Sequence, residues 1–436
     1  MPYDIIVGRN ESDKKDFGDR GLVYLGKGFV KMGQYTSLSN KIFMDIARSH
    51  VVLVAGKRGS GKSYTLGVIA EELANLEKEA SENIASLIFD TMGIYWTMKF
   101  KNEKDRDLLR EWNLKSQHLP VKIFVPAGHY EEYTSKSIPV DQKFALDPAE
   151  LSPEDWVITF GLDIINPVAV LIERKVNELK QENFFSIADI IKEIEADKKS
   201  SQEIKNSATG LLEAAQTWGI FANTKKEATK VEDLVNAGET TVLDLSVYNS
   251  VGAFNVRALV IGLLSRKIFN QRMSARRNEE IKAVSKGLSF LTPQEKKDYP
   301  LTWIFIDEAH EFLPAIGKTA ATDALVQLLR EGRQPGISLV LATQQPGQIH
   351  GDVMTQSDIV ISHRVTSAPD LGSLNKIMQS YLLESIKQYM DDLPSLKGSA
   401  IILDDNSERI YPMRIHPRFT WHGGEAPTAI KAEKKL

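Results

Sequence analysis

The chain has 436 residues, of which 42% are hydrophobic and 26% charged, and its formal net charge is −4. This composition excludes a disordered chain and a collagen-like one, and the length leaves room for two or three domains. Because there is no cysteine, disulfides, zinc ribbons and a cysteine nucleophile are excluded. No apolar run approaches the roughly 20 residues that cross a bilayer. We therefore expect a cytoplasmic protein without a membrane segment.

Residues 1–50 are rich in glycine and alternate weakly between apolar and polar side chains, which predicts a small N-terminal β element. From residue 51 the chain changes to continuous apolar runs separated by helical patterns. The runs that we interpret as strands lie at residues 51–55, 86–90, 121–125, 241–245, 302–307, 338–343, 358–362 and 400–403. Strands that are apolar on both faces and alternate with helices predict an α/β fold with a doubly wound, mostly parallel sheet.

Between the third and the fourth of these strands the pattern is helical. Ser152 precedes a proline, Ser186 precedes isoleucines at helical spacing, and both arrangements are typical of a helix start. Residues 279–300, with two prolines and a Lys-Lys pair, predict a mobile loop. The predicted parts of the chain are the β element (1–50), the first part of the core (51–140), an all-helical insertion (141–238), the second part of the core (239–410) and a C-terminal extension (411–436).

The strongest chemical signal follows the first strand at once, at Gly56-Lys-Arg-Gly-Ser-Gly-Lys-Ser63. Glycines let several backbone N–H groups converge on one phosphate, and the helix that begins here directs its positive end at the same anion. Lys62 can reach the β- and γ-phosphates, and the Ser63 hydroxyl can bind Mg²⁺. The motif therefore predicts a site for ATP and Mg²⁺. Its nucleotide-binding residues are predicted to be Gly56, Gly59, Ser60, Gly61, Lys62, Ser63 and Tyr64.

Three further strands end in polar residues that suit ATP hydrolysis. Asp307 can hold Mg²⁺ through water, and the adjacent Glu308 can polarise the attacking water. Gln344, after the next strand, can contact the γ-phosphate or that water, although an ordinary polar strand end has the same appearance. Asp90, which ends the second strand, is either a further carboxylate on the Mg²⁺ side or a cap of the strand end.

The motifs occur in an order that resembles the HerA branch of the HerA/FtsK translocases. The pieces that carry the resemblance are Arg48-Ser-His50, the phosphate loop, Ile-Asp307-Glu308-Ala-His310, Arg330-Glu-Gly-Arg333, Ala342-Thr-Gln344-Gln345-Pro346, Ser362-His-Arg364-Val and Arg414-Ile-His-Pro-Arg418-Phe-Thr-Trp-His422-Gly-Gly424. The resemblance implies a RecA-like P-loop ATPase core that forms a homo-hexamer around double-stranded DNA, with ATP between subunits. It also implies a partner, either a nuclease such as NurA or another effector.

The resemblance assigns further roles by position. Arg364 is expected to act as an arginine finger on the ATP of the neighbouring subunit, with Arg333 as its rival, and Arg48 is expected to act within its own subunit. The catalytic residues are then Glu308, Gln344, Arg364 and Arg48, and the metal residues are Ser63 and Asp307. Two departures from the family pattern concern a short N-terminal β element and Ile94, which stands where the family has a glutamate.

Two other functions fit the same residues. A regulatory ATPase scaffold would control a bound effector with little DNA movement of its own. A conjugation-type ATPase would pump substrate through a membrane channel, and the lack of a membrane segment argues against it. Lys318, in the loop after the Asp-Glu strand, is a candidate for a residue that lines a DNA pore.

Overall fold

The structure is a computed structural model that describes residues 3–32, 35–249, 254–286, 299–365, 367–378 and 386–424. The described residues form one sheet of 13 strands. In chain order the strands are β1 (Ile5–Val7), β2 (Leu22–Met32), β3 (Tyr35–Asp45), β4 (Val51–Ala55), β5 (Ile84–Asp90), β6 (Lys122–Pro126), β7 (Gln142–Phe144), β8 (Thr240–Asp244), β9 (Leu301–Ile306), β10 (Ile337–Thr343), β11 (Ile359–His363), β12 (Ser399–Asp404) and β13 (Arg409–Ile415). Their order across the sheet is β1-β3-β2-β13-β12-β11-β4-β10-β9-β5-β8-β6-β7.

The half of the sheet from β11 to β7 is parallel throughout. Every residue of β5, β8, β10 and β11 is buried, as expected for strands that are covered on both faces. The predicted α/β fold with a mostly parallel sheet is confirmed. Each strand predicted from an apolar run is present within two residues of its predicted bounds.

The other half of the sheet joins the two ends of the chain. β12 is antiparallel to β11, and β13 lies between β12 and β2 and is antiparallel to both. The N-terminal β element therefore continues the core sheet. It also contains an unpredicted helix, α1 (Glu11–Phe17), which begins where the Asn10 side chain accepts a hydrogen bond from the backbone N–H of Asp13.

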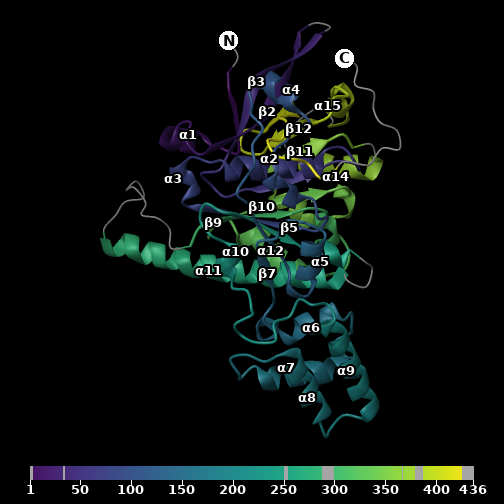
Figure 1. Cartoon of the computed structure of the whole chain (residues 1–436). Helices are drawn as coiled ribbons and strands as arrows, with labels where there is room; N and C mark the ends of the chain where they lie inside the picture. Colours follow the sequence, from purple (N-terminus) through teal and green to yellow (C-terminus); the bar gives the residue numbers. More distant parts are fainter. Residues whose placement is uncertain are drawn as a thin grey trace.

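Helices cover both faces of the sheet (Figure 1). Leu53 and Val54 are neighbours in β4 but belong to two different hydrophobic clusters, because successive side chains of a strand face opposite sides. The helices are α2 (Lys62–Ala74), α3 (Lys78–Ser81), α4 (Arg106–Glu111), α5 (Tyr130–Ser135), α6 (Pro153–Thr159), α7 (Pro167–Leu179), α8 (Ile187–Glu195), α9 (Gln202–Gln216), α10 (Val231–Leu234), α11 (Phe254–Lys286), α12 (Thr322–Glu331), α13 (Gly351–Gln356), α14 (Ala368–Met378) and α15 (Ile386–Asp392).

The insertion between the two parts of the core consists mainly of α6 to α9, which pack on one another below the sheet in Figure 1. Capping boxes at Ser152 and Ser186 begin α6 and α8, as predicted. Two expectations need correction. The stretch 141–238 is not all helical, since β7 pairs with β6. The predicted loop over 279–300 is helical at its start, because α11 continues to Lys286, and residues 287–298 lie outside the described residues.

The C-terminal extension is tied to α2 by a buried ion pair. Arg418 Nε donates to Glu71 Oε1 at 2.6 Å, and both side chains are fully buried. The other oxygen of Glu71 accepts from the backbone N–H of Phe419 at 2.7 Å. Gly67 leaves room for this contact, since a Cβ there would lie 2.5 Å from the Arg418 guanidinium. The extension thus packs on the helix that follows the phosphate loop.

Loss of the Arg418–Glu71 ion pair is predicted to lower the stability of the folded chain. Arg418→Met leaves the Glu71 carboxylate buried without its cation, which typically costs about 3–5 kcal/mol. We expect a clearly lower midpoint of thermal unfolding, and recovery of most of the loss when Glu71→Met is added. Lys318→Met, which removes an exposed ion pair with Asp323, is the control and should leave the midpoint nearly unchanged. An Arg418→Met chain as stable as the wild type would contradict the assignment.

Candidate active site

The phosphate loop leaves β4 at the carboxyl edge of the sheet and turns directly into α2. The backbone N–H of Gly56 donates to the Thr343 carbonyl at 3.3 Å, so the loop starts against the end of β10. A residue with a side chain would not fit at position 56, because its Cβ would lie 2.8 Å from the Cβ of His363. Gly61 precedes α2 with a φ of +113°, a conformation that other residues avoid. These contacts give the loop the shape that the motif predicts.

Lys62 is the buried cation of the site. Its side chain is 5% exposed, and Nζ donates to the Lys57 carbonyl across the loop at 3.3 Å. Burial lowers the pKa of the Lys62 ammonium, while the carboxylates of Glu308 and Asp307 act in the opposite direction. A desolvated ammonium near two carboxylates is placed to attract the phosphates of a nucleotide.

The acidic pair follows β9 directly. Glu308 has a φ of +51°, a strained conformation for a residue with a side chain, and its backbone N–H donates to Asp307 Oδ1 at 2.9 Å. Gln344, at the end of the neighbouring strand β10, donates from Nε2 to Glu308 Oε1. Burial, and then the charge of Asp307, raise the pKa of Glu308. The structure therefore brings together Lys62, Asp307, Glu308 and Gln344, as the sequence predicts.

The Ser63 hydroxyl and the Asp307 carboxylate are the oxygen groups that would hold a magnesium ion. The hydroxyl oxygen of Tyr95 lies 3.3 Å from the Ser63 carbonyl oxygen and 3.5 Å from Asp307 Oδ2, and its single proton can be donated to either of them. Mg²⁺ prefers hard oxygen ligands of this kind together with phosphate oxygens. Among the described residues, the buried Oε2 of Glu308 has no hydrogen-bond partner. It can accept a hydrogen bond from a water molecule.

Of the two roles that the sequence left open for Asp90, a carboxylate on the Mg²⁺ side or a cap of the strand end, the structure shows the cap. Its carboxylate accepts from the backbone N–H groups of Met92, Gly93 and Tyr95 at 3.1, 2.7 and 2.7 Å. Burial, reinforced by the nearby Asp244, raises the pKa of Asp90. Asp90 therefore shapes the turn that carries Tyr95 to Asp307. Tyr95 could not be predicted, because nothing in a lone tyrosine after a strand indicates that contact.

A buried histidine, His363, packs against the phosphate loop. His363 Nδ1 faces the Ser399 carbonyl at 3.0 Å, and a carbonyl only accepts, so Nδ1 carries the proton and Nε2 accepts from the Thr65 hydroxyl at 2.8 Å. Burial lowers the pKa of His363 to about 4, so the imidazole is neutral at physiological pH. The only sequence signal for His363 is its place in the Ser-His-Arg-Val piece of the family resemblance.

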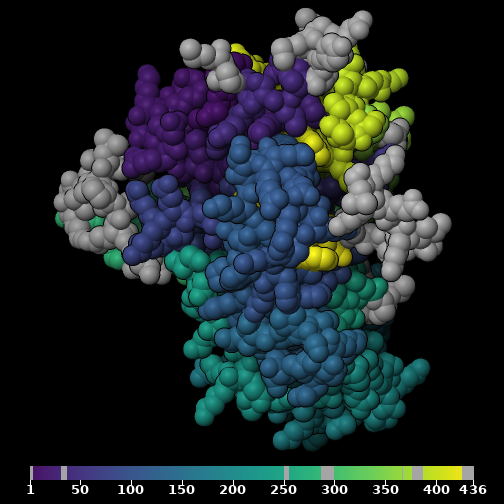
Figure 2. All heavy atoms as spheres, turned by 45° about the horizontal axis from the view of Figure 1, so that its top comes forward, coloured from purple at the N-terminus to yellow at the C-terminus, as the bar shows by residue number. Residues whose placement is uncertain are grey.

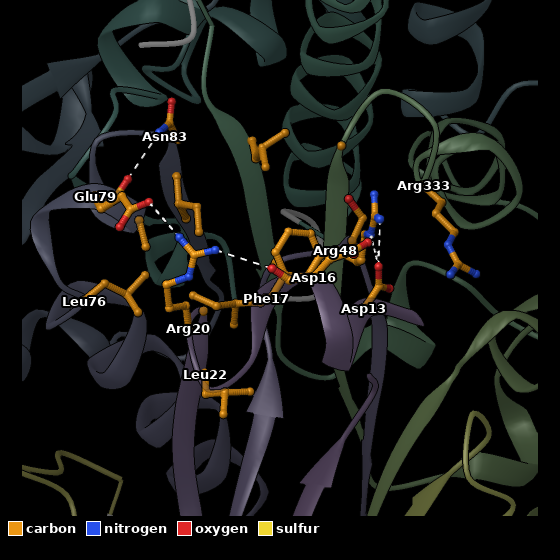
Figure 3. Close-up of a pocket in the computed structure, with 18 of the residues that line it drawn as sticks. Asp13, Asp16, Phe17, Arg20, Leu22, Arg48, Leu76, Glu79, Asn83 and Arg333 are labelled. Atoms are coloured by element: carbon orange, nitrogen blue, oxygen red, sulfur yellow. Dashed lines mark hydrogen bonds and ion pairs between the residues drawn. The ribbon is translucent and has the colours of Figure 1, made fainter. Parts of the chain in front are cut away.

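Arg48 does not join the site. It precedes β4, whereas the phosphate loop follows β4, so the whole strand separates them. Arg48 Nη2 donates to Asp13 Oδ1 at 2.7 Å, and its guanidinium lies 5.4 Å from the centre of the Phe17 ring. Figure 3 shows Arg48 beside Asp13 in a pocket at the amino-terminal edge of the sheet, which exposed Arg333 also lines. The expectation that Arg48 acts on the ATP of its own subunit does not fit this position.

Arg364 lies beside the phosphate loop, whereas Lys318 lies on the surface. Arg364 directly follows β11, its carbonyl accepts from the Lys57 N–H at 3.3 Å, and its guanidinium donates to the Leu393 carbonyl at 2.8 Å. It therefore contacts the phosphate loop of its own chain. Lys318 is exposed and forms an ion pair with Asp323 at 2.8 Å.

Comparison with known proteins identifies the family. The family described as "Helicase HerA, central domain" matches residues 30–268, more than half of the chain. The chain belongs to this family. It is 22% identical over 370 residues to a protein of Sulfurisphaera tokodaii named DNA double-strand break repair helicase HerA, and the match covers 84% of this chain and 64% of that relative. A Pyrococcus furiosus protein of the same name is 28% identical over 191 residues, which are 39% of this chain and 32% of the relative.

This HerA-family chain also resembles a solved structure over most of its length. VirB4 of Thermoanaerobacter pseudethanolicus superposes with a TM-score of 0.55 at 12% identity, over 92% of this chain and 97% of VirB4. At this identity the likeness shows the fold, a RecA-like P-loop ATPase core. No helix among the described residues has the length and apolar character that crossing a membrane requires.

The site predicts that Lys62 and Glu308 separate ATP binding from hydrolysis. Lys62→Ala removes the cation that faces the phosphates, so the Kd for ATP should rise. Glu308→Gln keeps the shape of the site but loses the anion that polarises water, so ATP should bind and persist. Equilibrium binding and turnover measured with DNA present check both, with Lys78→Ala on exposed α3 as the control. The role of Glu308 is wrong if Glu308→Gln hydrolyses ATP at nearly the wild-type rate.

Proposed function

We propose that this HerA-family ATPase is a motor that moves along double-stranded DNA as a homo-hexameric ring and uses Mg²⁺ and ATP. The observation that carries the proposal is the cluster of Lys62, Asp307, Glu308 and Gln344 around the phosphate loop in a chain of this family. Ser63 and Asp307 would hold Mg²⁺, which would neutralise charge on the β- and γ-phosphates when bound. Glu308 would orient the attacking water, and Gln344 would sense the γ-phosphate.

A partner protein belongs to the proposal. We infer that the ring works beside a nuclease like NurA, or beside another effector, in the cytoplasm. Support comes from the printed names of the relatives, which are double-strand break repair helicases. The matched stretches span from about a third to about two thirds of those relatives, so their activity carries over to this chain as part of the proposal.

DNA binding is expected to be electrostatic and indifferent to sequence, since a motor must contact every base step alike. The contacts are then backbone phosphates, and each one releases counterions when it forms. The Kd for duplex DNA should rise steeply between 50 and 200 mM salt, by about 10³–10⁵ for 6–10 phosphate contacts. Duplexes of different sequence should bind equally at each salt concentration. A flat salt response, or one strongly preferred sequence, would contradict this expectation.

An arginine from a neighbouring subunit is the remaining part of the proposed mechanism. Arg364 is the residue predicted for this role, and Arg333 is its rival. What supports Arg333 is its exposed position on the pocket edge, away from the phosphate loop of its own chain. Arg364 contacts its own phosphate loop through its backbone, which suits action on the nucleotide of the same subunit equally well.

Mixed rings separate these two candidates. An arginine finger that is well placed accelerates hydrolysis by about 10³–10⁵, so Ala at the finger should abolish turnover and leave ATP binding nearly intact. When such subunits are mixed with Glu308→Gln subunits, some interfaces join an intact site to an intact finger. Turnover should return for a finger that acts across the interface and stay absent for an arginine that acts within its subunit. We expect turnover to return for Arg364→Ala. No return for Arg364→Ala, together with return for Arg333→Ala, would make Arg333 the finger.

A further inference from the structure

The last described residues of the chain lie across the first turns of α2. Beyond the Arg418–Glu71 ion pair, Arg418 donates its backbone N–H to the Tyr64 hydroxyl at 2.7 Å. The Thr97 hydroxyl donates to the Trp421 carbonyl at 2.8 Å, and the Trp421 N–H donates to the Phe100 carbonyl at 2.8 Å. The backbone of this segment is therefore held on both sides, by α2 and by the turn after β5. Figure 2 shows yellow C-terminal residues at the surface against the blue part of the chain.

His422 is the residue of this segment that packs on the phosphate-loop helix. Its ring centre lies 5.2 Å from that of Tyr64, with an interplanar angle of 77°. Tyr64 directly follows Ser63 in the chain. In a phosphate loop the backbone N–H groups bind the α- and β-phosphates of a nucleotide, and the lysine reaches toward the γ-phosphate. The His422–Tyr64 pair therefore packs beside the part of the loop that serves the phosphates nearest the nucleoside.

The contact with Arg418 fixes the proton on the His422 ring. Arg418 Nη1 lies 3.2 Å from His422 Nδ1, and a guanidinium can only donate, so Nδ1 accepts and the proton of the neutral ring is on Nε2. Burial, with the charge of Arg418, lowers the pKa of His422 to about 3, which agrees with a neutral ring. Within the part of the chain that the structure describes, Nε2 has no hydrogen-bond acceptor.

Glycines keep the edge of this ring open. Gly423 and Gly424 follow His422 at once, and a Cβ on Gly424 would lie 3.0 Å from His422 Nε2. A larger residue at 424 would press on the nitrogen that carries the proton. An oriented N–H donor, an aromatic neighbour and a missing side chain together suit a flat ligand with acceptor atoms, such as a purine nucleoside.

We propose that His422 and Tyr64 bind the nucleoside part of ATP, with the Nε2–H of His422 donating to an acceptor of the adenine ring or of the ribose. This inference rests on the proposed ATPase function and adds the residues that recognise the nucleoside. The C-terminal segment then contributes to nucleotide affinity, and the phosphate loop does not act alone.

The test compares ATP with inorganic tripolyphosphate, which has the same phosphates and no nucleoside. Both Kd values are measured with Mg²⁺ by titration calorimetry, with every variant made in the Glu308→Gln background so that ATP persists. His422→Phe keeps a ring against Tyr64 and removes the donor. It should weaken ATP about five- to tenfold, the value of one hydrogen bond, and leave tripolyphosphate unchanged. His422→Gln keeps an N–H donor and should retain most of the affinity for ATP.

Trp421→Ala is the matched control. Trp421 lies next to His422 in the same segment, is 40% exposed, and is held through its backbone, so its side chain should not affect either ligand. The 2′-deoxy form of ATP separates the two acceptors. If His422→Phe weakens ATP but not 2′-deoxy-ATP, the donor serves the ribose 2′-hydroxyl; equal weakening of both assigns the donor to adenine or to another ribose oxygen.

Equal losses for ATP and tripolyphosphate would overturn the inference, because His422 would then only hold α2 in place. An unchanged Kd for ATP in His422→Phe would overturn it as well. Failure of the proposed function has a different signature, a chain with intact Glu308 that hydrolyses no ATP in the presence of DNA and Mg²⁺. A failure of the inference alone leaves that hydrolysis intact.

Discussion

The parallel pairing of β11, β4, β10 and β9 is the constraint on which the site depends. Each of these strands is hydrogen-bonded to the next in the same direction, so their carboxyl ends meet at one edge. The phosphate loop, the acidic pair and Gln344 each follow one of these ends, and His363 is the last residue of β11. Residues that are hundreds of positions apart in the chain are thereby brought within hydrogen-bonding distance, and no dedicated loop is needed to carry them.

Burial gives this edge its electrostatic character. Lys62 has its pKa lowered and Glu308 has its pKa raised, and burial is the first cause in both cases. The site thus holds one cation, Lys62, and two carboxylates, Asp307 and Glu308, in a poorly solvated environment. The charge of Lys62 balances only part of the charge of the two carboxylates. A magnesium nucleotide would supply the missing charges, with phosphates for Lys62 and a metal for Asp307. Polar groups that converge in a partly dry site in this way are typical of an enzyme that binds charge before it reacts.

Local patterns predicted the parts of the structure that local forces determine. The core strands could be predicted because each is apolar on both faces, and the phosphate loop because its glycines and Lys62 lie within eight consecutive residues. Contacts over long separations could not be predicted. Arg418 and Glu71 are 347 positions apart, and neither has a neighbour in sequence that indicates its partner. The misplacement of Arg48 has a different origin, since its role was taken from the family resemblance although Arg48 precedes the predicted strand 51–55 and the phosphate loop follows it.

The Arg418–Glu71 pair has a consequence for the order in which the protein is made. A ribosome completes α2 long before it reaches Arg418, and during that interval the Glu71 carboxylate has no arginine to neutralise it. In the same interval β2 lacks its neighbouring strand β13, which comes from the C-terminal region. The nascent chain therefore holds its phosphate-binding helix and its first long hairpin incompletely packed through most of its synthesis. The packing of α2 is complete only at the end of translation, when the C-terminal residues pack against it.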